Sequence, residues 1–108
     1  MLLWGVHITP EHIPVFERLA AAGYDGVEIP IAIQTEAELN TMVSACEDLG
    51  LARTASAFVG EETNPISPDP AIRAAAVDNL KRSIDGAAAI GADILVGGIY
   101  QAHKYFTG

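Results

Sequence analysis

The chain has 108 residues, of which 50% are hydrophobic and 19% are charged, so it corresponds to one small globular domain or to part of a larger one. Fourteen acidic residues against six basic ones give a formal net charge of −8. This charge argues against a nucleic-acid partner, because nucleic-acid-binding proteins need a basic face to neutralise phosphates.

Four short apolar runs alternate with three amphipathic segments along the chain. The first run, residues 2–8, is typical of a buried strand. Pro14 then suits the first turn of a helix, where its missing N–H costs nothing, and this helix is expected to end near Ala22. Residues 26–31 form the second apolar run and predict the second strand.

A capping box marks the start of the second helix. The Thr35 hydroxyl can accept from the Glu38 N–H, while the Glu38 carboxylate reaches back to the Thr35 N–H. Apolar residues follow at helical spacing, namely Leu39, Met42, Val43, Cys46 and Leu49. Residues 51–57 predict the third strand.

A long loop over residues 58–68 leads to the third helix, which Ser67 or Asp69 would cap. The predicted buried stripe of this helix consists of Ile72, Ala76, Leu80, Ile84 and Ala87. Residues 93–97 predict a fourth strand, and residues 98–108 predict a loop.

The resulting order, β-α-β-α-β-α-β, predicts parallel strands joined by right-handed crossovers. A doubly wound nucleotide-binding fold is disfavoured, because no GxGxxG follows the first strand and no GxxxxGK[ST] occurs. We therefore predict the α/β fold of a partial (β/α)₈ TIM barrel with four parallel strands and three helices.

A complete barrel of this kind needs roughly 250 residues and eight strands, so the chain is expected to be a fragment. Its outer strands would have unpaired edges, and the sheet face that lines a barrel would lack its cover. We expect an exposed apolar patch on the order of several hundred Å², and hence a homo-oligomer.

The single cysteine, Cys46, cannot form an intrachain disulfide and has no partner pattern for structural zinc. We expect an inert core thiol and a reducing, cytoplasmic compartment. The most apolar stretch, residues 86–100, contains Asp93 and is too short to span a bilayer, so no membrane partner is expected.

Two segments, GYDGVEIP and ISPDPAIRAAAVDNLKRSIDGAAAIGADILVGGIY, resemble the sugar isomerase/epimerase family with a xylose-isomerase-like TIM barrel, and within it the ketose 3-epimerases. The most specific pattern is carried by Ser67, Pro68, Asp69, Arg73, Lys81 and the pair Gly91-Ala92. The resemblance covers essentially the whole chain and implies that residues 1–108 form the N-terminal half of such a barrel.

Members of that family hold one divalent metal, Mn²⁺ or Mg²⁺, at the C-terminal mouth of the barrel. The ligands are two glutamates, an aspartate and a histidine from the last four strands, and the glutamates exchange the proton at the epimerised carbon through an enediolate. The resemblance therefore implies no catalytic or metal-binding residue in this chain, and a sugar substrate for the full-length protein.

Two candidate sugar contacts lie in the first half of the chain. His7 ends the first predicted strand, where the family tends to place an aromatic or polar residue near the sugar; a plain loop position is the alternative. Glu28 matches the family's second-strand glutamate, and it would point into the barrel because Val27 and Ile29 would face the helices. A sugar contact and a structural hydrogen bond beneath the site both remain open for Glu28.

Four further candidates lie where the third and fourth strands end. Ala57 leaves room for a ligand. Gly97 matches a family glycine that lets a substrate approach the backbone, although a simple bend would also explain it. Tyr100 and His103 lie where the family often has an aromatic residue against the sugar, whereas Phe58 is expected to serve core packing.

The predicted function is that of an N-terminal fragment of a metal-dependent, ketose 3-epimerase-like isomerase that is inactive alone and binds no metal by itself. The alternative is a non-catalytic half-barrel that self-associates or pairs with a chain supplying the other half.

Overall fold

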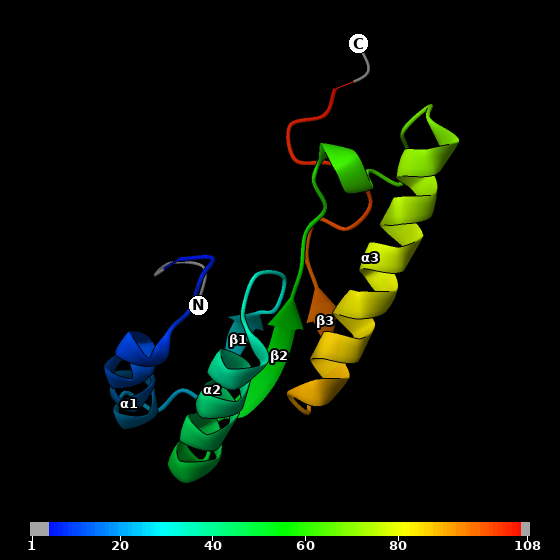
Figure 1. Cartoon of the computed structure of the whole chain (residues 1–108). Helices are drawn as coiled ribbons and strands as arrows, with labels where there is room; N and C mark the ends of the chain where they lie inside the picture. The colour runs from blue at the N-terminus through cyan, green and yellow to red at the C-terminus, as the bar shows by residue number, and fades with distance from the viewer. Residues whose placement is uncertain (1–4, 107–108) are drawn as a thin grey trace.

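Helices and strands alternate along residues 5–106, which are the residues that the computed structural model describes (Figure 1). The helices are α1 (Ile13–Ala21), α2 (Glu36–Leu49) and α3 (Pro70–Ala89), and the strands are β1 (Gly26–Pro30), β2 (Ala52–Ser56) and β3 (Leu95–Val96). Two short 3₁₀ helices, η1 (Pro10–His12) and η2 (Glu61–Thr63), precede α1 and α3.

The three strands form one parallel sheet in the order β1-β2-β3. Glu28 lies opposite Thr54, and Ser56 lies opposite both Pro30 and Val96. The strands run in one direction while α2 and α3 run back beside them, as Figure 1 shows. This arrangement is the α/β fold of a partial TIM barrel, as predicted.

The predicted capping box of α2 is confirmed. The Thr35 hydroxyl accepts from the Glu38 N–H at 3.2 Å, and the Glu38 carboxylate accepts from the Thr35 N–H at 2.8 Å. At the other end, Gly50 adopts the left-handed conformation with φ 66°, which a residue without a Cβ tolerates.

Helix α3 begins where the sequence predicts, and its buried side agrees with the predicted stripe except at Ile84. Asp69 is the cap, because its carboxylate accepts from the Ala71 N–H at 2.8 Å. The stripe includes Ala76, Ser83 and Ala87, whereas Ile84 is 59% exposed. The prediction for Ile84 was therefore wrong: the sheet beneath α3 ends at the two-residue strand β3, so nothing in the described residues covers that side of the helix.

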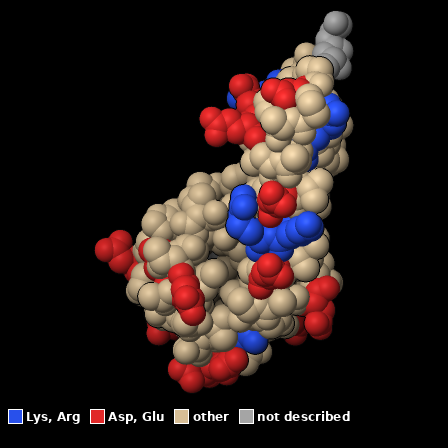
Figure 2. Space-filling model, turned by 45° about the vertical axis from the view of Figure 1, so that its right-hand side comes forward, with Lys and Arg blue, Asp and Glu red and all other residues tan. Residues whose placement is uncertain are grey.

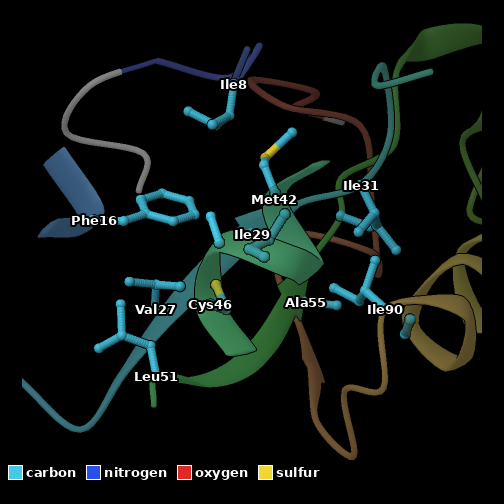
Figure 3. Close-up of a cluster of buried hydrophobic side chains, with 13 residues drawn as sticks. Ile8, Phe16, Val27, Ile29, Ile31, Met42, Cys46, Leu51, Ala55 and Ile90 are labelled. Carbon is cyan, nitrogen blue, oxygen red and sulfur yellow. The ribbon is translucent and has the colours of Figure 1, made fainter. Parts of the chain in front are cut away.

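The core fills the layer between the sheet and the helices (Figure 3). Phe16 of α1, Ile29 of β1 and Met42 of α2 are all fully buried. Ile90, directly after α3, closes the layer from the other side, as Figure 3 shows. Val27 and Ile29 thus face the helices, as the alternation of the second strand predicts.

Four strands were predicted, and the described residues contain three of them. The strand predicted over residues 2–8 lies partly outside them, and residues 5–8 are not a strand. Gly5 has φ 145°, and the Val6 carbonyl accepts from the Gln34 side-chain amide at 3.0 Å. The Gln34 side chain therefore hydrogen-bonds the Val6 carbonyl. In a closed barrel, the backbone of the first strand would instead bond to a neighbouring strand on each side.

The fourth predicted strand is present but shorter than residues 93–97, since β3 comprises Leu95 and Val96 alone. It ends at Gly97, whose φ of 136° lies outside the extended region. The third strand of the sheet is therefore shorter than the other two, and it ends at the edge where the candidate site lies.

Candidate functional site

The site forms at the carboxyl edge of the sheet, where β2 and β3 continue side by side beyond their last residues. The Ala57 N–H donates to the Val96 carbonyl at 2.9 Å, and the Val59 N–H donates to the Gly98 carbonyl at 3.3 Å. In parallel α/β sheets, this edge is where ligands bind.

Gly97 lies in close contact with the neighbouring chain segment. A Cβ at this position would lie 1.8 Å from the Ala57 carbonyl oxygen, which no side chain allows. The requirement for glycine therefore follows from the approach to Ala57, which is itself almost fully buried. This contact accounts for the residue type and leaves open whether a substrate also approaches the backbone at Gly97.

A pocket of about 510 Å³ opens at this edge, and we call it the strand-end pocket. Its lining comes from the residues after β2, from the residues after β3 and from the N-terminal segment: Val6, Phe58, Gly98, Tyr100, Gln101, Ala102, His103 and Lys104. The predicted site residues Tyr100 and His103 are thus among the lining residues, as is Phe58. Ala57, Gly97, His7 and Glu28 are not among the lining residues.

Asn64 holds the wall of the strand-end pocket, and sequence reasoning missed this residue. It is 1% exposed, and its side-chain oxygen accepts from the Ala102 N–H at 3.2 Å and from the Ile66 N–H at 3.3 Å. The sequence shows only an Asn-Pro turn signal, which does not reveal a partner 38 residues away.

The wall itself is a turn. The Tyr105 N–H donates to the Ala102 carbonyl at 3.1 Å, which places His103 and Lys104 at the tip. The Gln101 amide spans the same turn and donates to the Tyr105 carbonyl at 3.2 Å. Lys104 has φ 61°, the only positive φ of a non-glycine residue among residues 5–106.

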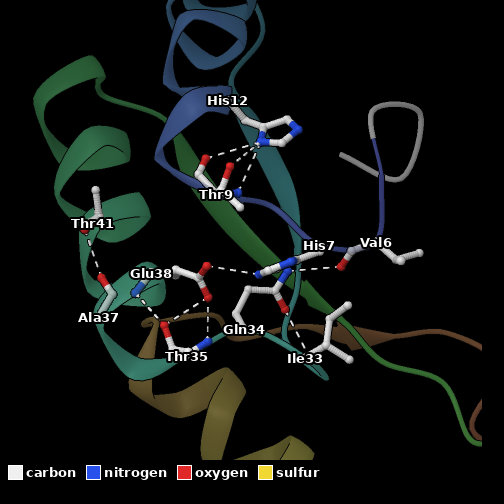
Figure 4. Close-up of polar contacts among 10 residues, drawn as sticks. All are labelled: Val6, His7, Thr9, His12, Ile33, Gln34, Thr35, Ala37, Glu38 and Thr41. Atoms are coloured by element: carbon white, nitrogen blue, oxygen red, sulfur yellow. Dashed lines mark hydrogen bonds and ion pairs between the residues drawn. The ribbon is translucent and has the colours of Figure 1, made fainter.

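His7 contacts helix α2 (Figure 4). Its Nε2 lies 3.0 Å from the Glu38 carboxylate, and its side chain is 50% exposed. The Thr35 backbone N–H, and after it the Thr35 hydroxyl and His7, hold the pKa of Glu38 below its ordinary value. His7 therefore extends the cap of α2 in this structure, one residue away from the pocket residue Val6.

Glu28 lies on the opposite face of β1 from Val27 and Ile29, as predicted, but it is only half-buried. It makes no hydrogen bond or ion pair among residues 5–106. The expected burial is incomplete because this sheet face lacks the cover of a closed barrel.

Ser56 is a second residue that the sequence did not single out. It lies two positions beyond Thr54, the register partner of Glu28, and therefore on the same face of the sheet. Its hydroxyl is buried and has no hydrogen-bond partner in the described part of the chain. The face that lines a barrel thus carries polar groups on adjacent strands.

Cys46 is fully buried and free, as predicted. Burial raises the pKa of its thiol to about 11, against a smaller opposing effect of the Arg53 guanidinium. The thiolate form, which is the reactive one, is therefore disfavoured.

Residues 5–106 contain no group of three or more His, Cys, Asp or Glu side chains that could hold a metal ion. The described residues therefore do not fit the divalent metal that the resemblance implies, and no chemical step of this chain is assigned to one. Among the same residues, no helix is both long and apolar enough to cross a membrane.

Comparisons with known proteins support the fold. A ketose 3-epimerase of Arthrobacter globiformis is 34% identical over 106 residues, which are 97% of this chain and 37% of that protein. The structure of D-allulose 3-epimerase from Methylomonas sp. in complex with D-allulose matches 89% of this chain and 33% of its own, with a TM-score of 0.77 and 28% identity. A D-psicose 3-epimerase structure in the presence of D-fructose matches 88% of this chain and 34% of its own, with a TM-score of 0.76 and 26% identity.

The chain therefore spans about a third of the length of these relatives. The model of the xylose isomerase-like TIM barrel family matches residues 16–106, which include all three strands and the wall of the strand-end pocket. The chain belongs to the xylose isomerase-like TIM barrel family.

Proposed function

We propose that residues 1–108 form the N-terminal part, about a third, of a ketose 3-epimerase-like barrel and supply substrate-binding residues to its mouth. The observation that carries this proposal is the 34% identity to a ketose 3-epimerase across 97% of the chain, combined with a pocket at the carboxyl edge of the sheet. Most small-molecule sites in such barrels lie at this edge.

The lining of the strand-end pocket suits a sugar. The Phe58 ring and Val6 provide an apolar wall for the C–H face of a ketose. The Tyr100 hydroxyl and the His103 ring can donate to and accept from the sugar hydroxyls. In the assembled barrel, Glu28, Thr54 and Ser56 would add hydrogen-bonding groups on the interior face.

In this proposal, groups outside this chain transfer the proton at C3 of the ketose. In the full-length family, a divalent metal and two glutamates of the last four strands supply that chemistry, and residues 5–106 offer no set of side chains that could hold such a metal. We propose that the chain by itself is inactive, because the proton-transferring groups implied by the resemblance would come from the rest of the barrel.

Exchange of the ketose C3 proton in deuterated water tests the proposal. The purified chain, with Mn²⁺ and D-fructose or D-psicose, should give no exchange above buffer. Mixing it with a chain that carries the remaining strands of a related ketose 3-epimerase should restore exchange. Exchange by the chain alone would contradict its inactivity, and no exchange in a mixture that has formed a complex would contradict the proposed role.

A substitution in the restored mixture tests the site itself. Glu28→Gln should weaken ketose binding while the far-ultraviolet circular dichroism stays unchanged, because Gln keeps the shape and removes the charge. Thr41→Ala, on the outer surface of α2, is the matched control and should change nothing. An unchanged ketose affinity for Glu28→Gln would assign Glu28 a structural role instead.

The second candidate function is a half-barrel that associates with a copy of itself, and the exposed apolar side chains favour it. Helix α3 exposes 51% of Val77 and 59% of Ile84, which lie two turns apart on one side of the helix. Both β1 and β3 are edge strands in the described sheet. These surfaces are typical of an element that packs against a further layer.

We also propose a cytoplasmic location. The lone Cys46 is buried as a free thiol, which is the usual state in a reducing compartment. Fractionation of the source cells should place the chain with the cytosolic proteins; recovery from the medium or from a periplasmic fraction would contradict this location.

A further inference from the structure

The strand-end pocket has a charge opposite to that of the whole chain. The formal net charge is −8, and Figure 2 shows acidic side chains spread over the face that it draws, around a central group of basic ones. None of the residues that line the pocket is acidic, whereas Lys104 belongs to the lining. The local charge therefore favours an anion.

The backbone at Lys104 is held in place at the pocket wall. It is at the tip of a turn with φ 61°, a conformation that costs a residue other than glycine on the order of 1 kcal/mol. The turn is fixed from below by the buried Asn64, whose side-chain oxygen accepts from the Ala102 N–H at 3.2 Å. The turn therefore fixes the point on the wall from which the Lys104 side chain extends.

No described carboxylate neutralises this cation. Among residues 5–106, the ion pairs join His7 to Glu38 and Arg53 to Glu47, and neither involves Lys104. Its ammonium group therefore remains available to a ligand.

We infer that the strand-end pocket binds the phosphate group of a phosphorylated ketose, with Lys104 as the charge partner. Three donor groups of the segment after β3, namely the Lys104 ammonium, the His103 ring N–H and the Tyr100 hydroxyl, equal in number the three terminal oxygens of a phosphate monoester. Phe58 and Val6 form the apolar wall for the sugar. The volume of about 510 Å³ falls within the range of small-ligand sites. This inference rests on the proposed function, because it names the substrate class of the same site.

Titration of the ¹⁵N-labelled chain, followed by its amide resonances, tests the inference. The ligands are D-fructose 6-phosphate, D-fructose, inorganic phosphate and D-gluconate at matched ionic strength. D-Fructose 6-phosphate should shift the resonances of residues 98–105 and bind at least about tenfold more tightly than D-fructose. Lys104→Gln should remove that difference, and Lys104→Arg should retain it.

Lys81→Gln is the matched control, because Lys81 is an exposed lysine of α3 away from the pocket. Equal affinity for D-fructose 6-phosphate and D-fructose, or equal effects of Lys104→Gln and Lys81→Gln, would overturn the inference and leave the proposed function standing. D-Gluconate binding as tightly as D-fructose 6-phosphate would overturn the choice of phosphate in favour of a carboxylate.

Two further outcomes separate this inference from the proposed function. If D-fructose 6-phosphate binds no better than inorganic phosphate, the pocket recognises the anion alone, which would count against a sugar site and therefore against both. If no ligand binds, the inference fails, whereas the proposed function is still decided by proton exchange in the reconstituted mixture.

Discussion

The backbone of Gly97 passes so close to the Ala57 carbonyl that no side chain fits between them. A Cβ would lie 1.8 Å from that oxygen, and the φ of 136° is one that an alanine rarely adopts. Gly97→Ala should therefore lower the free energy of unfolding by at least about 2 kcal/mol, measured by urea denaturation.

The adjacent glycine offers a matched control for that prediction. A Cβ on Gly98 would meet nothing within 4 Å, so Gly98→Ala should change the free energy of unfolding by less than about 1 kcal/mol. Equal effects of the two substitutions would contradict the close contact between the segments that follow β2 and β3.

Because the Cys46 thiol is buried, the free energy of unfolding should depend on pH in the alkaline range. Burial raises its pKa to about 11, so the folded chain holds the thiol proton at pH values where the unfolded chain has released it. The stability contributed by the neutral thiol is complete below the ordinary thiol pKa and is lost as pH rises towards 11. The free energy of unfolding, measured by urea denaturation from pH 8 to pH 11, should fall more steeply for the natural chain than for Cys46→Ala.

At the scale of elements, helix α2 connects the N-terminal segment to the sheet. Thr35 and Glu38 cap its first turn, and His7 binds the same carboxylate from residues that precede α1 (Figure 4). Met42 and Cys46 bury the other side of the helix in the core. A weaker cap should therefore affect the whole layer and not only the helix end.

Thr35→Ala should lower the free energy of unfolding by about 1 kcal/mol, because the N–H of Glu38 loses its acceptor. For a domain of this size, that corresponds to a fall of roughly 4–8 °C in Tm, which thermal denaturation measures. Thr41→Ala is the matched control on the same helix, since the Thr41 hydroxyl only donates back to the Ala37 carbonyl. A Tm for Thr35→Ala equal to that of Thr41→Ala would show that the cap does not stabilise the helix.

At the scale of the whole molecule, the described chain is extended rather than globular. Its radius of gyration is 15.1 Å and its principal extents are 47 × 26 × 22 Å. A compact domain of this length has a radius of gyration of about 13 Å. The difference reflects a sheet of three strands with helices packed on it and no further strands on either edge among residues 5–106.

This shape predicts self-association of the purified chain. Size-exclusion chromatography with light scattering should give a mass of twice 11.3 kDa or more, and a hydrophobic dye should bind to any monomer that remains. Ile84→Glu, on the exposed side of α3, should shift the mass towards the monomer if α3 forms the contact. A clean monomer that binds no dye would contradict the prediction.

The sequence by itself determined which residues form the helices and most of the strands, because these depend on local signals. Thr35 with Glu38, Pro14, and glycines such as Gly50 act within a few residues of their own positions, so the chain pattern reveals them. The face of β1 that turns towards the helices also followed from alternation alone. The family resemblance carried by residues 67–92 was also visible in the sequence alone.

Only the tertiary structure decided which residues share the candidate site. Asn64 and Ala102 are 38 residues apart, and their hydrogen bond brings the loop before α3 against the turn that carries Lys104. Gly97 needs its residue type because of Ala57, forty positions earlier. Ile84 and residues 5–8 differ from expectation because an amphipathic pattern describes a complete fold, whereas exposure and strand pairing depend on which neighbours are present. Contacts of this kind depend on the packing of distant segments, and no local pattern of residues encodes them.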